Sequence, residues 1–163
     1  MQQHQNDALT HTGYQAILYR RNNLQDRQDM DKLLANRAIE VVDAIYPQLG
    51  ELIRLNNPGI RWNTADITRY IEQHIGSTPL YDYGTWAYYP WLNKIVHLLD
   101  EEEFIKVRTS RNIYKITPGE IAILRKKKVG IIGLSVGQSI AIAMAMERIC
   151  GELRLADFDE LEL

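Results

Sequence analysis

The sequence predicts a mixed α/β protein in which a helical and aromatic-hairpin region precedes the first strand–helix–strand unit of a parallel α/β domain. Aromatic and β-branched residues gather at 81–99 on either side of Pro90, which is typical of a hairpin. After Thr117, a capped helix, an apolar strand, a small-residue helix and a second strand follow in order. We therefore expect two regions, residues 1–107 and residues 108–163.

Composition excludes several classes of protein. The chain of 163 residues is 45% hydrophobic and 25% charged, which is typical of a globular protein. Its net charge of −2 gives no reason to expect nucleic acid or a membrane as a partner. The lone Cys150 rules out an intramolecular disulfide, and neither a signal peptide nor a run of roughly 18 apolar residues is present. We expect a cytoplasmic protein.

Two helices are predicted in the N-terminal region. Apolar residues recur at helical spacing from Asp29 to Leu55 and predict one helix with a bend near Pro47 and Gly50. Asn63 or Thr64 then caps a second helix.

The segment after the hairpin begins with acidic residues. Residues 100–103 predict a linker or the start of a helix. The pattern of residues 104–116 is ambiguous and is compatible with a short strand. The motif Thr117-Pro-Gly-Glu120 predicts a helix N-terminus with a capping box. The positive charges of residues 125–128 suit the C-terminal end of that helix.

A strand–helix–strand unit is predicted next. Val129–Gly133 is a short apolar strand of the kind that is buried on both faces in a parallel sheet. Ile140–Ile149 is a small-residue helix for which Gly151 is the expected C-cap. Leu153–Asp157 is the expected second strand.

This unit carries the candidate nucleotide site. Gly133 and Gly137 lie where strand gives way to helix, so backbone could approach a phosphate at a helix N-terminus. Asp157 follows Gly133 by 24 residues and is placed to bind ribose hydroxyls. Ser135 and Gln138 stand where the dinucleotide-binding fingerprint has glycine. The alternative interpretation is that both glycines serve only the turn and helix–strand packing.

Residues 128–137 (Lys-Val-Gly-Ile-Ile-Gly-Leu-Ser-Val-Gly) and 151–159 (Gly-Glu-Leu-Arg-Leu-Ala-Asp-Phe-Asp) resemble the opening of the ThiF family of E1-like, ubiquitin-activating-type adenylyltransferases. Arg108-Thr-Ser-Arg111-Asn resembles the upstream Arg-x-x-Arg-Gln of that family. The aromatic residues at 88–99 resemble a rarer bacterial subgroup, in which a ThiF-type domain precedes a nitroreductase-like domain that would bind flavin.

The resemblance implies a Rossmann-like domain that uses ATP and Mg²⁺ to adenylylate the C-terminal carboxylate of a ubiquitin-like or sulfur-carrier protein. It also implies a homodimer, because Arg111 matches an arginine that reaches the triphosphate of the neighbouring subunit. The family's downstream arginine, lysine and aspartate would fall beyond residue 163. We therefore expect a truncated domain that is inactive alone.

The resemblance also assigns roles at the candidate site. Gly133 and Gly137 would line the phosphate turn. Ser135 and Gln138 depart from the family's glycines, so either the Ser135 hydroxyl donates a hydrogen bond to the phosphate or ATP binding has been lost. Asp157 would bind the ribose, and Asp159 would lie near the metal or the phosphates.

Two alternative functions are also compatible with the sequence. In a Rossmann oxidoreductase that binds NAD(P) or FAD, Asp157 would hold the adenosine ribose. In a non-catalytic ThiF-like module, the same unit would serve dimerisation or docking. His74 and His97 have no partner at metal-ligand spacing, so we expect them to be structural, and no metal ligand is predicted.

Overall fold

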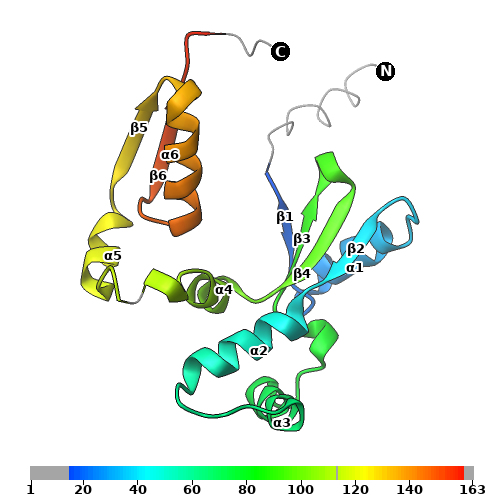
Figure 1. The fold of residues 1–163 in the computed structure, drawn as a ribbon. Helices are drawn as coiled ribbons and strands as arrows, with labels where there is room; N and C mark the ends of the chain where they lie inside the picture. The colour runs from blue at the N-terminus through cyan, green and yellow to red at the C-terminus, as the bar shows by residue number, and fades with distance from the viewer. Residues whose placement is uncertain (1–14, 113, 160–163) are drawn as a thin grey trace, which may run out of the picture. The chain divides into compact units, whose positions relative to one another are not determined.

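The computed structural model describes residues 15–112 and 114–159 of the chain. It is a mixed α/β protein (Figure 1). The chain divides into two compact units, Met1–Phe104 and Ile105–Leu163. The predicted boundary lies three residues further along the chain, between residues 107 and 108.

Unit 1 is built on a four-stranded sheet with the strand order β1-β3-β4-β2 (Figure 1). Its strands are β1 (Ile17–Tyr19), β2 (Glu40–Asp43), β3 (Thr85–Tyr89) and β4 (Lys94–Leu98). β3 is antiparallel to both β1 and β4, whereas β2 runs parallel to β4. A 3₁₀ turn at Pro90–Leu92 joins β3 to β4, and Asn93 follows it with a left-handed φ of 47°. The predicted hairpin around Pro90 is confirmed.

The prediction of one helix from Asp29 to Leu55 is wrong. The structure has α1 (Leu24–Leu34), then β2, then α2 (Ile45–Asn56). Adjacent β-branched residues, Val41 and Val42, favour an extended backbone, and β4 supplies a parallel partner, with Val42 opposite Val96. Pairing with a distant strand therefore outweighs the local helical spacing. Pro47 lies in the first turn of α2, where its missing N–H removes no helical bond.

The third helix of unit 1 begins as predicted. α3 (Thr64–Ile75) has Asn63 as its N-cap, whose side chain accepts a hydrogen bond from the amide of Asp66 at 2.8 Å. A short 3₁₀ helix, Leu80–Asp82, follows before β3.

Two groups of apolar side chains fill unit 1. Met30 of α1 is fully buried and packs with Ile39, Trp86 and Ile95. A second set, on α2 and α3, is also buried and consists of Ile45, Leu49, Leu52, Ile53, Ile67 and Ile71. The fully buried polar residue is His97 of β4, at 0% exposure. Unit 1 thus has a conventional apolar core with one histidine inside it.

The segment that follows the sheet is helical. α4 (Glu101–Arg108) begins within the acidic run, and a 3₁₀ turn, Ser110–Asn112, follows it. No strand occurs in the described part of residues 104–116. α5 (Pro118–Leu124) carries the predicted capping box: Glu120 accepts from the amide of Thr117 at 2.8 Å, and Thr117 Oγ1 accepts from the amide of Glu120 at 3.3 Å.

Unit 2 contains the predicted strand–helix–strand order. β5 (Lys128–Ile132) and β6 (Glu152–Ala156) pair in parallel, and α6 (Leu134–Glu147) connects them. In Figure 1, α6 runs back alongside the two strands, so its N-terminus and the C-terminal ends of both strands share one end of the unit. That end carries the candidate site.

The helix C-cap predicted at Gly151 is wrong. α6 ends at Glu147, and its C-cap is Arg148, which takes the left-handed conformation with a φ of 51°. Gly151 instead donates its amide hydrogen to the Lys127 carbonyl at 2.9 Å. A Cβ on Gly151 would lie 1.9 Å from the carbonyl oxygen of Arg125, so the glycine is required by close approach of two backbone segments.

The strands of unit 2 are not buried on both faces, as the apolar sequence of β5 predicted. Ile132 is 74% exposed and Leu155 is 52% exposed. On α6, Val136 is 77% exposed. Two strands and one helix are too few to cover both faces of the pair, which is why these apolar side chains remain in contact with solvent.

Candidate functional site

The turn between β5 and α6 has free space beside its backbone at Gly133. Gly133 is the N-cap of α6 and has a φ of 87°, a conformation that favours glycine. Its amide donates to the carbonyl of Ala156 at 2.9 Å, which joins the turn to the end of β6. A Cβ at Gly133 would meet nothing within 4 Å, so the turn presents free space beside a helix N-terminus.

Gly137 has a packing role in the structure. It is buried in α6, and a Cβ at this position would lie 2.7 Å from Cγ2 of Ile131 on β5. The missing side chain lets the helix approach the strand closely. A contact between Gly137 and phosphate stays a prediction.

Asp157 lies directly after β6 and caps the N-terminus of α6. Its Oδ2 accepts a hydrogen bond from the amide of Leu134 at 2.6 Å. Its Oδ1 accepts from the amides of Phe158 at 2.7 Å and Asp159 at 3.2 Å. These backbone donors hold the pKa of the Asp157 carboxyl below its usual value, and the amide of Leu134 has the largest effect. The turn therefore carries an ionised carboxylate at the positive end of the helix dipole.

Ser135 and Asp159 complete this end of the unit. Ser135 lies in the first turn of α6 and is exposed. Asp159 is also exposed, and its amide is held by Asp157. Gly133, Ser135, Asp157 and Asp159 thus lie at the same end of the unit, around the turn.

Arg111 lies away from the turn between β5 and α6, in another part of unit 2. It is exposed in the 3₁₀ turn before α5, and its neighbour Asn112 is buried. The Asn112 side chain donates to the carboxylate of Glu147, the last residue of α6. Because a 14-residue helix is about 20 Å long, this contact places Arg111 at the opposite end of α6 from Gly133. The structure does not bring Arg111 to the turn of its own chain.

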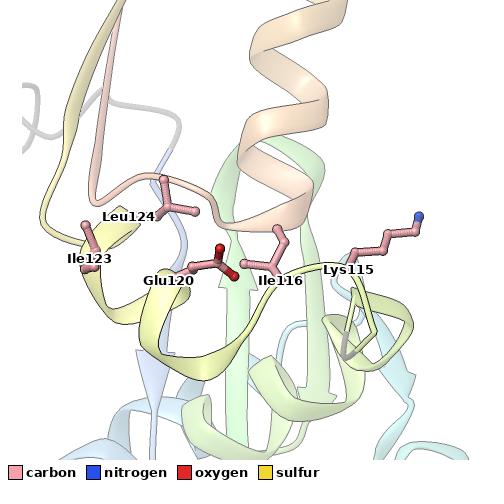
Figure 2. A pocket seen from close by; sticks show the side chains of 5 residues that line it. All are labelled: Lys115, Ile116, Glu120, Ile123 and Leu124. Carbon is pink, nitrogen blue, oxygen red and sulfur yellow. The ribbon is translucent and has the colours of Figure 1, made fainter.

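A pocket of about 310 Å³ lies on and before α5 (Figure 2). Its lining residues are Lys115, Ile116, Glu120, Ile123 and Leu124. The walls are largely apolar, and the one carboxylate, Glu120, already caps α5, which lowers its pKa through the amide of Thr117. The sequence analysis did not single out this pocket. Its apolar residues lie close to the capping box, and the sequence pattern there predicts the start of a helix but gives no indication of a pocket.

Unit 1 contains a polar cluster that the sequence analysis also missed. His74 Nε2 lies 2.7 Å from Oε1 of Glu103, and the Tyr83 hydroxyl donates to Glu103 at 2.9 Å. Burial, reinforced by the Glu103 carboxylate, raises the pKa of Tyr83. These residues come from α3, from the segment before β3 and from α4, so no short motif connects them. Among residues 15–112 and 114–159, no group of three or more His, Cys, Asp or Glu side chains is arranged to hold a metal ion.

Comparison with known proteins gives one long match. The chain is 37% identical over 134 residues to an uncharacterized protein of Mycobacterium tuberculosis (strain CDC 1551 / Oshkosh). The alignment covers 82% of this chain but 16% of that relative, so the chain spans about a sixth of the relative's length. No protein-family model and no solved structure matches the chain. Within the part of the chain that the structure describes, no helix is both long enough and apolar enough to span a bilayer.

Proposed function

We propose that unit 2 is the opening segment of a Rossmann-like, ThiF-type domain that binds ATP and adenylylates the C-terminal carboxylate of a ubiquitin-like or sulfur-carrier protein. The observation that carries the proposal is the bond from the Leu134 amide to Asp157. It joins the carboxylate after the second strand to the helix after the first strand. Nucleotides bind at this place in Rossmann-like folds.

The residues at the turn fit a nucleotide. A carboxylate offers about four lone-pair sites, and the described amide bonds use two on Oδ1 of Asp157 and one on Oδ2. Oδ2 therefore keeps a site that can accept a ribose hydroxyl. The free space at Gly133 and the exposed Ser135 hydroxyl suit a phosphate at the helix N-terminus.

Asp159 fits a role beside Mg²⁺. Magnesium in nucleotide sites is held by one or two carboxylates together with substrate phosphates and water. The exposed carboxylate of Asp159 next to Asp157 supplies such a donor set without a closed protein cage. Bound ATP would supply the phosphorus that the carrier's carboxylate attacks, with pyrophosphate as the leaving group.

The position of Arg111 supports a homodimer. Arg111 lies about one helix length from the turn of its own chain, because its neighbour Asn112 is attached to Glu147 at the far end of α6. If Arg111 offsets phosphate charge, it would do so at the turn of another copy. Arg111 of one protomer would then complete the site of its partner.

Nuclear magnetic resonance titration of the ¹⁵N-labelled 163-residue chain tests nucleotide binding. Adding Mg·ATP should shift the amide signals of Gly133, Ser135 and Asp157, and Asp157→Ala should weaken this binding at least tenfold. Asp66→Asn, which changes a half-buried carboxylate of α3, is the control and should bind as the wild type does. Unmoved signals at millimolar ATP would contradict the proposal. Saturable shifts with NAD⁺ in place of ATP would favour the oxidoreductase.

A second candidate function is a non-catalytic docking module. Val136, Ile140 and Met146 lie on the exposed side of α6 and are 77%, 53% and 47% exposed. A helix that is apolar all round is typically buried on both sides. Sedimentation of the chain tests dimerisation: Ile140→Asp should leave a monomer with unchanged helix content. Dimerisation without any effect of ATP on the turn would favour this function over adenylylation.

A further inference from the structure

The pocket on and before α5 exposes apolar surface to water (Figure 2). Ile116, Ile123 and Leu124 supply its apolar side chains, and Ile123 is 60% exposed. The lining carboxylate, Glu120, accepts hydrogen bonds from the amide and the hydroxyl of Thr117. A cavity of about 150 Å³ already binds benzene, so this volume of about 310 Å³ can hold an aromatic side chain.

Four cations border this pocket. Lys115 is a lining residue, and Figure 2 shows its side chain extending outward. Arg125, Lys126 and Lys127 follow Leu124 directly and are exposed, and the amide of Lys127 donates to the Leu124 carbonyl at 2.9 Å. None of the four cations has an acidic partner among the described residues. An apolar interior with a positive border fits an apolar side chain that is flanked by carboxylates.

The same unit carries a segment of that chemistry. Phe158 is 91% exposed and stands between Asp157 and Asp159. With Glu160 and Glu162, the run of residues 157–162 contains four carboxylates. We call this run the acidic aromatic segment. Its exposed ring and its charge complement the pocket and the cations around it.

The pocket and Phe158 of one chain lie at opposite ends of the strand pair in unit 2. β5 begins at Lys128, directly after the three consecutive cations, and β6 runs parallel to it. Ala156, two residues before Phe158, lies opposite Ile132 at the other end of β5. A parallel strand of five residues extends about 17 Å. A second copy of the chain is therefore needed to bring the ring to the pocket.

We propose that the acidic aromatic segment of one copy docks at the pocket of a second copy. Phe158 enters between the apolar lining residues, and the carboxylates of the segment face Lys115 and residues 125–127. The inference rests on the homodimer of the proposed function and names its contact surface.

The place of Arg111 agrees with this pairing. Its neighbour Asn112 is attached to Glu147 at the C-terminal end of α6. Just after that end, Gly151 donates its amide hydrogen to the carbonyl of Lys127 beside the pocket. Arg111 and the pocket thus share one end of unit 2, whereas the turn and the acidic aromatic segment share the other. An antiparallel pair of copies satisfies both contacts at once.

Sedimentation equilibrium of the 163-residue chain measures the interface. Phe158→Ser should raise the dissociation constant of the dimer at least tenfold, and the double variant Lys126→Glu/Lys127→Glu should do the same. Both changes are at exposed positions, so the helix content should stay unchanged. Salt should weaken the wild-type dimer, because it screens exposed charges. A wild type that stays monomeric, or a Phe158→Ser variant that dimerises equally well, overturns the proposal.

Two controls separate this interface from other apolar or charged surfaces. Ile140→Asp changes the exposed side of α6, and Lys32→Glu/Arg37→Glu makes the same change of charge in unit 1. Both should dimerise as the wild type does. If Ile140→Asp is monomeric while Phe158→Ser dimerises, the interface is the face of α6 and the pocket is not the docking site.

A mixture of two defective copies tests the direction of docking. Phe158→Ser retains its pocket, and Lys126→Glu/Lys127→Glu retains its acidic aromatic segment, so a mixed pair has one intact contact. The mixture should form dimers at concentrations at which each variant alone is monomeric. Absence of mixed dimers contradicts docking of the segment at the pocket.

Nucleotide binding is measured separately, by the shifts of the turn amides on adding Mg·ATP. A dimer that depends on Phe158 but whose turn does not respond to ATP supports this interface and contradicts ATP binding. A turn that responds to ATP in a chain whose association is independent of Phe158 overturns the interface and leaves ATP binding in place.

Discussion

The Oδ2 atom of Asp157 accepts the amide hydrogen of Leu134 at 2.6 Å, which ties the end of β6 to the first turn of α6. The two residues are 23 positions apart in the chain. The contact combines a cap, a favourable charge at a helix N-terminus and the meeting of two parallel strand ends. It is therefore both a structural bond of unit 2 and the centre of the candidate site.

Asp157→Ala should expose the amide of Leu134 to hydrogen exchange. The variant removes the acceptor, so the protection factor of this amide should fall, as measured by exchange-resolved nuclear magnetic resonance. Asp159→Ala is the matched control, because Asp159 accepts no bond from Leu134. An unchanged protection factor in Asp157→Ala would show that the cap does not form in solution.

The same carboxylate predicts an acid dependence. Its pKa is lowered in the folded chain, so the stabilisation is complete above about pH 4, the usual value for an unfolded aspartate, and is lost as pH falls further. Exchange of the Leu134 amide, corrected for its intrinsic rate, should therefore be less protected at pH 3 than at pH 6. Asp157→Ala should show no such difference.

Gly151→Ala should destabilise unit 2. The added Cβ would lie 1.9 Å from the Arg125 carbonyl oxygen, and backbone cannot move aside as a flexible side chain can. Overpacking of this kind costs about 1–3 kcal/mol of unfolding free energy, measured by urea titration. Gly119→Ala in α5 is the control, because its Cβ would meet nothing within 4 Å. Equal stability of the two variants would refute the close approach.

Tyr83→Phe should weaken the attachment of the first turn of α4, at Glu103, within unit 1. The change removes the hydroxyl that donates to both oxygens of Glu103, at a cost of about 1 kcal/mol. Because the pKa of Tyr83 is raised in the folded chain, the wild type should also lose stability above about pH 10, where an unfolded tyrosine ionises. Tyr83→Phe should lose less over the same range. Denaturant titrations at pH 8 and pH 11 would compare the two proteins.

Asn112→Ala should detach the 3₁₀ turn from the C-terminal end of α6. It removes the donor to the Glu147 carboxylate, and a hydrogen bond to a charged group contributes about 1.5–3 kcal/mol. Glu147→Gln keeps an acceptor and should be milder. If Glu147→Gln loses as much stability in urea as Asn112→Ala does, a neutral acceptor does not sustain the contact and the expected order is contradicted.

Local chemistry explains what could be predicted from the sequence. The caps at Asn63 and Thr117 depend on residues within three positions, and both are confirmed. Gly133 follows β5 and Asp157 follows β6. The two residues lie close together because the carboxyl ends of parallel strands meet at the same edge of a sheet. Such features need no knowledge of distant partners.

The remaining features depend on partners far apart in the chain. β2 was assigned to a helix because its partner β4 lies 54 residues away, and the spacing around Val41 does not reveal that pairing. His97 Nδ1 lies 3.0 Å from Oδ1 of Asp43, and these two residues are also 54 positions apart, with neither in a motif. Arg111 could not be placed by sequence either, since its position follows from the bond between Asn112 and Glu147.

The mixed sheet of unit 1 also has a consequence for the order of folding. The β3–β4 hairpin closes through a short turn, whereas the connection between β2 and β4 is residues 44–93 and includes α2 and α3. Loop-closure entropy opposes the longer connection, and non-local strand pairing is slow. We therefore expect the hairpin to form before β2 docks, so that Asp43 meets His97 in one of the last steps in which unit 1 reaches its native state.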